Sequence, residues 1–377
     1  MYYNDLCGES ASALGFGTEH LPQTDGHIDQ EQVDQLVDRA LEGGINYFDT
    51  AYGYCGGRAE KALGKALSRH DRSSFLYADK FPGYDLDNFG KHEQIFEEQL
   101  ERSGLERFDF YLLHNVCELN VDQYLDGKEY RIVEYFLEQR DAGRIGHLGF
   151  SSHAQVRTFQ RVVSGLAKDA EFAQIQINWM DWTFQDAGDK LSILRQRGLP
   201  VVATEPVRGG TLASIDEQGM AELDEVRPGL TAAEWSFMFQ QSLKGVAVTV
   251  TGVSCIDELE QDLAIYGTRQ ELTRNERDAL ADVGERISAI GMVPCTRCGA
   301  CTSRCLNYID IPGLIALYNE HLSTGGKGHI APMAIEAMRE SQRPGACNGC
   351  KRCEHVCPQE IDISEIMRTL KEDVKEH

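Results

Sequence analysis

The stretch that decides the fold runs from Gly44 to Tyr54 and reads GINYFDTAYGY. Within it, Asn46–Asp49 is a short run that ends in a carboxylate, and a helical pattern at Gln30–Glu42 precedes it. A short apolar run bounded by amphipathic helices is typical of a strand in a parallel sheet. The same strand–helix unit recurs along the chain, so its repetition, rather than any one copy, predicts the architecture.

Eight such units follow one another over about 260 residues, which favours a closed (β/α)8 TIM barrel of the α/β class. An open doubly wound sheet is the alternative, but the stretch after Gly15-Phe16-Gly17 does not complete a Gly-x-Gly-x-x-Gly turn. The predicted strands are Ala13–Gly17, Asn46–Asp49, Phe75–Lys80, Phe108–Leu113, His147–Phe150, Phe172–Ile177, Leu199–Ala203 and Val246–Thr251. The predicted helices are Gln30–Glu42, Arg58–Arg69, His92–Ser103, Tyr130–Ala142, Ala154–Ser164, Lys190–Arg197, Ala232–Gln241 and Ile256–Tyr266.

A change of composition near residue 291 predicts a domain boundary. One more helix is predicted at Thr273–Ile290, and its start has the capping-box spacing of Thr273 and Glu276. The chain then breaks at Gly291–Pro294 and becomes rich in cysteine and glycine. We therefore predict two domains, a barrel formed by residues 1–291 and a smaller domain formed by residues 292–377.

The net charge and the absence of targeting patterns argue against nucleic-acid partners and against a membrane span. The chain of 377 residues carries 37 Lys and Arg against 60 Asp and Glu, a net charge of −23. Such a chain repels phosphate backbones, so we expect no nucleic-acid partner. The N-terminus has no basic start followed by an apolar run, and no stretch approaches about 18 apolar residues. We expect a cytoplasmic protein without a membrane span.

Eight of the 12 cysteines form an internal repeat in the second domain. The copies are Cys295-x2-Cys298-x2-Cys301-x3-Cys305 and Cys347-x2-Cys350-x2-Cys353-x3-Cys357, each followed by Ile-Asp-Ile and a predicted short helix. Disulfides are not expected in a reducing compartment, so metal ligation is the better interpretation. This spacing holds 4Fe–4S clusters in bacterial ferredoxins. Zinc is the alternative, but zinc sites use paired Cys-x2-Cys units.

Three closely spaced thiolates can wrap one corner of a cubic cluster, whereas the fourth faces away and ligates the other cluster. One cluster is therefore predicted to bind Cys295, Cys298, Cys301 and Cys357, and the other Cys347, Cys350, Cys353 and Cys305. The segment resembles a bacterial two-cluster ferredoxin, which implies a ferredoxin-like domain of α+β or helical structure. Leu306 departs from that pattern, because proline is usual after the fourth cysteine, as at Pro358.

Three polar residues end successive strands of the predicted barrel: Asp49, Lys80 and His114. Catalytic groups of such barrels lie at the carboxyl ends of strands, so these side chains should converge. Tyr54 follows Asp49 by five positions. We expect the Lys80 charge to lower the pKa of Tyr54, Asp49 to hold the lysine, and His114 to orient a carbonyl oxygen. A purely structural Asp49–Lys80 ion pair is the alternative.

With these residues in place, the segment from about Leu14 to Tyr266 resembles the aldo/keto reductases. The matching motifs are Phe48-Asp49-Thr50-Ala51-x-x-Tyr54, Lys80, Leu113-His114, Gly149-Phe150-Ser151-Ser152 and Gln174-x-x-x-Asn178. The resemblance implies that Ser151, Ser152 and Gln174 hold a nicotinamide carboxamide. It also implies dinucleotide phosphates near Arg208 and near Gly252 and Ser254.

Two features depart from the common pattern of that family. The stretch Ala203–Gly210 contains no aromatic residue to stack on nicotinamide, and Thr251–Asp257 contains no Lys or Arg to bind a 2′-phosphate. In addition, Asp262 stands where asparagine is common. The sequence therefore does not decide between NADPH and NADH as the cofactor.

The sequence thus predicts an oxidoreductase. Tyr54 would protonate the oxygen of a small carbonyl substrate, or act in reverse on an alcohol, and two 4Fe–4S clusters would exchange electrons with a redox partner protein. Nicotinamide moves two electrons as hydride whereas a cluster moves one, and the sequence shows no flavin motif to join them. The alternatives are an electron-transfer or ligand-binding protein, or a non-redox lyase or dehydratase that uses Tyr54 and Lys80.

Overall fold

The computed structural model describes residues 1–126, 129–289, 291–295 and 298–373, so the predicted helix end at Ile290 lies outside the described residues. The chain divides into two compact units. The first comprises Met1–Val116 and Val121–Val283, and the second comprises Cys117–Asn120 together with the chain from Gly284 onward. The boundary that the sequence places between residues 291 and 292 stays a prediction.

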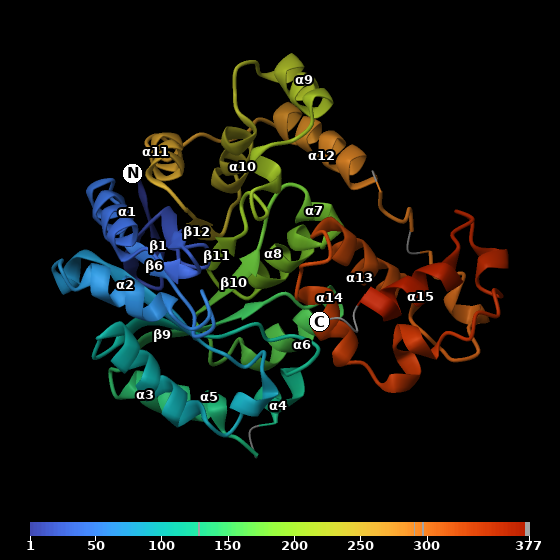
Figure 1. The fold of residues 1–377 in the computed structure, drawn as a ribbon, viewed down its shortest axis with the longest axis horizontal. Helices are drawn as coiled ribbons and strands as arrows, with labels where there is room; N and C mark the ends of the chain where they lie inside the picture. The colour runs from blue at the N-terminus through green and yellow to red at the C-terminus, as the bar shows by residue number, and fades with distance from the viewer. Residues whose placement is uncertain (127–128, 290, 296–297, 374–377) are drawn as a thin grey trace. The chain divides into compact units, whose positions relative to one another are not determined.

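Eight parallel strands close into a barrel in the first unit, with β12 pairing back onto β3 (Figure 1). Helices surround the strands in this view. The predicted barrel is confirmed, and the open sheet is wrong because no edge strand remains in the ring. In ring order the strands are β3 (Leu14–Gly17), β6 (Tyr47–Asp49), β7 (Leu76–Phe81), β8 (Phe108–Leu113), β9 (Ile145–Ser152), β10 (Phe172–Gln176), β11 (Val201–Thr204) and β12 (Val246–Gly252).

Every helix predicted for the barrel is present, with ends that shift by at most a few residues. The capping box of the last one is confirmed, because the Thr273 N–H donates to Glu276 Oε2 at 2.6 Å and the Glu276 N–H donates to Thr273 Oγ1 at 3.3 Å. Helices α4, α7 and α9 were not predicted. The helices are α1 (Gln30–Glu42), α2 (Ala59–Leu67), α3 (His92–Ser103), α4 (Val121–Leu125), α5 (Ile132–Asp141), α6 (Val156–Leu166), α7 (Asp181–Phe184), α8 (Ala187–Gln196), α9 (Glu217–Val226), α10 (Ala232–Gln241), α11 (Ile256–Ile265) and α12 (Arg274–Ala289).

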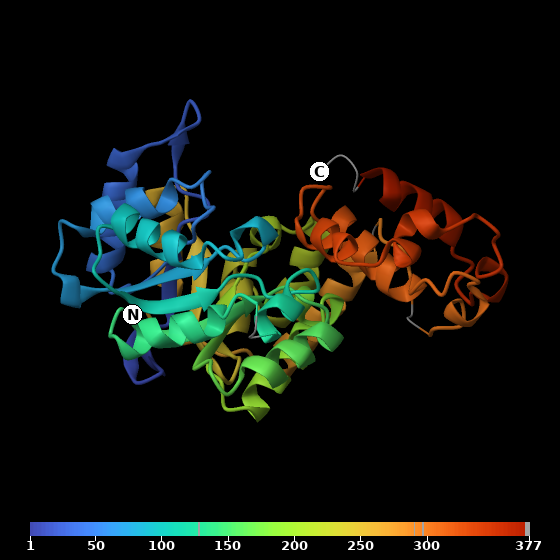
Figure 2. The ribbon, with the colours of Figure 1, turned by 90° about the horizontal axis from the view of Figure 1, so that it is seen from below.

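Two N-terminal hairpins were also missed. The first consists of β1 (Tyr3–Leu6) and β2 (Glu9–Ser12), and the second of β4 (Gln23–Thr24) and β5 (His27–Ile28). Leu6 and Ala11 are fully buried in one apolar cluster with the inward-facing side chains of the barrel strands. The first hairpin therefore closes one end of the barrel, and Figure 2 shows the second hairpin at the opposite end.

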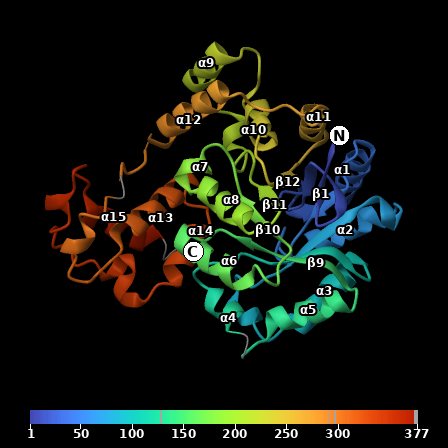
Figure 3. The same cartoon turned by 180° about the vertical axis from the view of Figure 1, so that it is seen from behind.

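The second unit is helical in the part of it that the structure describes, where no strand occurs. After the cysteines of the first copy its α-helices are α13 (Ile311–Ser323), α14 (Ile330–Glu336) and α15 (Ile363–Asp373), drawn orange to red in Figure 3. Both Ile-Asp-Ile segments start a helix, as predicted. In the first copy the two isoleucines are buried, and Asp310 Oδ1 accepts from the Gly313 N–H at 3.2 Å. The motif thus caps a helix and anchors it in one step.

Side chains alternate between the two faces of a strand, and this alternation sorts the residues of β7. Ala78 and Lys80 face the barrel interior, whereas Asp79 points outward toward the helices and is fully buried there. Asp79 Oδ1 and Glu60 Oε1 each accept a hydrogen bond from Gln99 Nε2, at 2.8 and 2.9 Å. Burial, and the negative charge of the other carboxylate, raises the pKa of Asp79.

This pair predicts a pH-dependent stability. The folded protein keeps a proton on Asp79 that the unfolded chain releases above about pH 4. The associated stability is present below that pH and is lost as the pH rises toward the raised folded pKa. Asp79→Asn should therefore gain about 1 kcal/mol relative to the wild type between pH 5 and pH 8. Urea titrations followed by tryptophan fluorescence measure the gain, and the same gain in the exposed control Asp141→Asn would contradict it.

Candidate functional site

An ion pair lies inside the barrel at the ends of β6 and β7. Lys80 is fully buried and Asp49 is 2% exposed. Lys80 Nζ donates to Asp49 Oδ1 at 2.5 Å and to the Thr50 carbonyl at 2.8 Å, while Gln174 Nε2 donates to Asp49 Oδ2 at 2.8 Å. A buried ion pair is tolerated only when its remaining polar atoms are satisfied, and both carboxylate oxygens here are engaged.

Tyr54 and His114 lie beside this pair, so the structure brings together all four predicted catalytic residues. Lys80 Nζ is 4.9 Å from the centroid of the Tyr54 ring. The Tyr54 and His114 rings meet edge to face with centroids 5.9 Å apart. His114 follows the last residue of β8, and its N–H donates to the Phe81 carbonyl at 3.0 Å. The four side chains come from the ends of β6, β7 and β8, which are neighbours in the ring, or from the loops that follow them.

Tyr84 also belongs to this site and was missed in the sequence. Its ring meets the His114 ring edge to face at 5.2 Å. Gly53 allows this approach, because a Cβ at that position would lie 2.2 Å from the Tyr84 hydroxyl oxygen. Tyr84 follows the end of β7 by three residues, in a loop at the carboxyl end of a strand. That position was the available signal, since such loops build barrel active sites.

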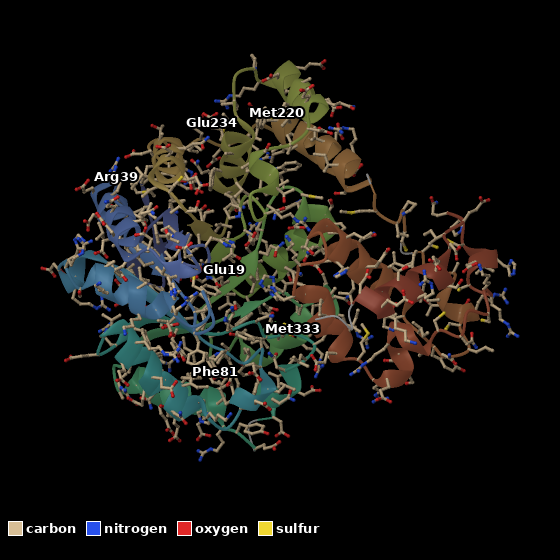
Figure 4. The ribbon with its side chains drawn as sticks, viewed as in Figure 1. Glu19, Arg39, Phe81, Met220, Glu234 and Met333 are labelled. Carbon is tan, nitrogen blue, oxygen red and sulfur yellow. The ribbon has the colours of Figure 1, made fainter. Side chains whose placement is uncertain are left out.

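The pKa of Tyr54 is raised, whereas the sequence predicted a pKa lowered by the Lys80 charge. Burial raises that pKa well above its usual value, and the charges of Glu19, Asp49 and Glu205 add to the rise. The lysine charge is already balanced by Asp49. Ligand-type atoms of Glu19, His20 and Glu205 lie within 4.8 Å of one another, so this side of the site is acidic. Figure 4 shows Glu19 near the middle of the barrel.

The residues proposed to hold nicotinamide are adjacent. Ser151 on β9 and Gln174 on β10 are register partners, and both are buried with Ser152. Ser151 Oγ accepts from the Asn115 N–H at 2.8 Å, and Ser152 Oγ donates to the Val116 carbonyl at 2.6 Å. Both serines therefore also fix the loop that follows His114. Ser151 and Gln174 are neighbouring buried polar side chains, and Gln174 contacts the Asp49 carboxylate, so polar groups that suit a carboxamide lie next to the ion pair.

The residues proposed to bind phosphate make other contacts. Arg208 Nε donates to Asp181 Oδ2 at 3.1 Å. Gly252 ends β12, and Ser254 precedes α11. Both the Ser254 N–H and its hydroxyl donate to Glu258 Oε2, at 2.7 and 2.9 Å. A carboxylate thus holds the helix N-terminal donors that a phosphate would use. Sequence reasoning missed this role of Glu258.

Two cavities in the second unit each gather four cysteines. One is lined by Cys305, Cys347, Cys350 and Cys353, and we call it the Cys305 cavity. The other is lined by Cys295, Cys298, Cys301 and Cys357, and we call it the Cys357 cavity. Each set takes three cysteines from one copy of the repeat and one from the other copy. Four thiols around one small cavity are the donor set that a 4Fe–4S cluster requires, so the residues fit that group.

The aldo/keto reductase family model matches residues 13–284, which is most of the chain. The protein belongs to the aldo/keto reductase family. A 4Fe–4S dicluster domain model matches residues 291–361, which favours iron–sulfur clusters over zinc. The chain is therefore an aldo/keto reductase-like oxidoreductase with an appended iron–sulfur domain. Among the described residues, no helix is long and apolar enough to span a lipid bilayer.

Curated relatives and a solved structure cover about two thirds to three quarters of this chain. It is 25% identical over 298 residues to L-galactose dehydrogenase of Arabidopsis thaliana, covering 73% of this chain and 90% of the relative. It is 27% identical over 277 residues to the uncharacterized oxidoreductase YqkF of Bacillus subtilis (strain 168), covering 65% and 85%. The solved holo form of aldo-keto reductase AKR11C1 from Bacillus halodurans has a TM-score of 0.59 at 23% identity, covering 75% and 95%, and supports the fold.

The crossed arrangement of the cysteines predicts the outcome of two double substitutions. Cys301→Ala with Cys357→Ala removes two thiols from one cavity and leaves the other complete. Cys353→Ala with Cys357→Ala removes one thiol from each. Anaerobically purified wild type should hold about eight iron atoms per chain. The first variant should keep one intact four-iron cluster by iron analysis and electron paramagnetic resonance, and the second none. The reverse result would show ligation within each copy.

Proposed function

We propose that this oxidoreductase reduces a small carbonyl substrate, or oxidises the corresponding alcohol, with Tyr54 as the general acid. The gathering of Tyr54, His114, Lys80 and Asp49 at one end of the barrel carries the proposal. Reducing a carbonyl places negative charge on its oxygen, and a phenol at hydrogen-bond distance can neutralise it with a proton.

Each residue of the site has a distinct part in that proton transfer. The raised pKa of Tyr54 keeps its hydroxyl protonated at neutral pH, so the proton is available to donate. Lys80 lies against the Tyr54 ring and, held by Asp49, favours the phenolate that remains after donation. His114 lies edge-on to Tyr54 and positions the substrate oxygen. Tyr84 packs against His114 and limits the access of water.

A nicotinamide cofactor, NADPH or NADH, supplies the hydride when bound. Ser151, Ser152 and Gln174 hold its carboxamide in our proposal, which their burial on adjacent strands beside Asp49 supports. The contacts between Ser254 and Glu258 indicate weak binding of phosphate and no selectivity for the 2′-phosphate of NADPH.

The cysteines of the two cavities ligate two 4Fe–4S clusters in this proposal, and the clusters exchange single electrons with a partner protein. The domain boundary lies between residues 291 and 292. Thiol ligands of such clusters persist in a reducing compartment, which supports a cytoplasmic location. One-electron clusters do not accept hydride, so nicotinamide alone should leave their absorbance unchanged.

A second candidate is a barrel that performs non-redox acid–base chemistry, such as dehydration. The engagement of Ser254 by Glu258 favours it, because a dinucleotide then loses part of its phosphate site. Isothermal titration of the protein with NADH and NADPH distinguishes the two candidates. No binding of either dinucleotide would favour the dehydratase.

Removal of the Tyr54 hydroxyl tests the general acid. Tyr54→Phe should lower carbonyl reduction, measured on a panel of aldehydes and ketones, by about 10²–10⁴-fold. In the wild type the rate should not decline between pH 6 and about pH 9, because the raised pKa keeps the phenol protonated. Tyr3→Phe, at a position that is 47% exposed, is the control. Unchanged turnover in Tyr54→Phe would refute the assignment.

Removal of the carboxylate that engages Ser254 tests the phosphate site. Glu258→Gln should strengthen binding of NADH and NADPH by several-fold. It removes a negative charge at the start of α11 and weakens the hold on the Ser254 N–H and hydroxyl, which can then donate to a phosphate. Asp257→Asn removes the same charge from the same helix turn without a contact to Ser254, and it is the matched control. Calorimetry that finds equal gains in both variants would point to a general charge effect and would contradict this role of Glu258.

A further inference from the structure

The two cysteine cavities differ in the residues that accompany the cysteines. Besides the four thiols, the Cys305 cavity is lined by Arg304, Leu306 and Lys351. The Cys357 cavity is lined by proline, isoleucine, glycine and glutamine, with no charged side chain among its described lining residues. An internal repeat would make the two sites alike, so the difference calls for a comparison position by position.

The repeat provides that comparison, because its copies are offset by 52 positions. Where one copy has Arg304, the other has Val356. The loop positions Lys351 and Arg352 correspond to Gly299 and Ala300. Arg304 and Lys351 line the Cys305 cavity, and Arg352 follows Lys351 in the chain. None of the three counterparts carries a charge, and the one arginine in the loop between Cys295 and Cys301 is Arg297, whose counterpart is Gly349.

Apolar exposure shows the same asymmetry. Leu306 is 60% exposed and Tyr308 is 80% exposed, whereas their counterparts are Pro358 and Glu360. Tyr308 and Glu360 both adopt positive φ, of 54° and 51°, so the two turns share a conformation and differ in chemistry. Exposed large apolar side chains beside a functional site are typical of a protein contact.

The charge on this rim comes from its two arginines. Lys351 Nζ is 3.4 Å from Glu354 and 3.6 Å from Asp362, which offset its charge. Arg304 and Arg352 are exposed and form no ion pair with any residue that the structure describes. On a chain with a net charge of −23, a local positive patch attracts an acidic partner once salt screens charges beyond about 8 Å.

We propose that the surface around the Cys305 cavity is the docking surface for an acidic one-electron carrier protein. Its rim comprises Arg304 and Leu306, which line the cavity, and the exposed Tyr308 and Arg352, which are close to lining residues in the sequence. The proposal rests on the iron–sulfur part of the proposed function. One electron leaves the reduced carrier and is taken up by the cluster of the Cys305 cavity, with no proton or atom transferred. In this proposal an electron reaches the cluster of the Cys357 cavity from the cluster of the Cys305 cavity, and not directly from the carrier.

Flavodoxin hydroquinone, from a small acidic flavoprotein that transfers single electrons, is the probe. Stopped-flow absorbance under anaerobic conditions gives the second-order rate constant for cluster reduction, and calorimetry gives the affinity of oxidised flavodoxin. In the wild type both should fall as the salt concentration rises. In Arg304→Glu/Arg352→Glu the rate constant should fall by about tenfold or more at low salt. Tyr308→Asn, which tolerates positive φ, should weaken binding at all salt concentrations.

Arg197→Glu, an exposed arginine between α8 and β11, is the control for charge reversal elsewhere and should match the wild type. Iron content and bleaching by dithionite should stay unchanged in every variant. If the anaerobically purified wild type contains no iron, the proposed clusters themselves are refuted. If the clusters are intact, equal rates in the wild type and in the double variant, or no reduction of the wild type by flavodoxin, would overturn the docking surface.

Discussion

The barrel site depends on one buried contact, the ion pair between Lys80 and Asp49. Burying either charge alone would cost several kcal/mol, so each requires the other together with further hydrogen-bond partners. Thr50 provides its carbonyl and Gln174 its amide, which joins β6, β7 and β10 through one carboxylate. The contact holds Lys80 against the Tyr54 ring. The hydrogen bonds that neutralise the Lys80 charge are therefore also the ones that hold the lysine beside Tyr54.

The charge of the barrel end explains why this site departs from the expectation of an acidified tyrosine. Glu19 and Glu205 surround Tyr54 and raise its pKa. Glu258 occupies the donors of Ser254 at the start of α11. These carboxylates put negative charge at the end of the barrel where the negatively charged phosphates of a dinucleotide would bind in the proposed function. Glu19 and Glu205 thus act on the phenol, whereas a different carboxylate, Glu258, engages the donors at the start of α11.

In the second unit a duplicated motif builds two similar cavities that differ at their rims. The Ile-Asp-Ile segments bury their isoleucines and start α13 and α15, so each copy has the same local structure. Each cavity takes one cysteine from the other copy, which binds the two halves together. The copies differ at corresponding positions, because Arg304 and Tyr308 of the first copy correspond to Val356 and Glu360 of the second. The cysteine sets of the two cavities are alike, and the difference lies in the residues around them.

The sequence alone determined the elements whose pattern is local or repeated. The eight strand–helix units, the Thr273 capping box and the spacing of the cysteines follow from periodicity and residue type within short segments, and the structure contains them. Only the tertiary structure revealed the N-terminal hairpins, Tyr84 beside His114, and Glu258 on Ser254. It also reversed the expected pKa of Tyr54. A pKa depends on burial and on charges brought from distant parts of the chain. Glu19 and Glu205 are far apart in the sequence, and only the closed barrel brings both of them near Tyr54.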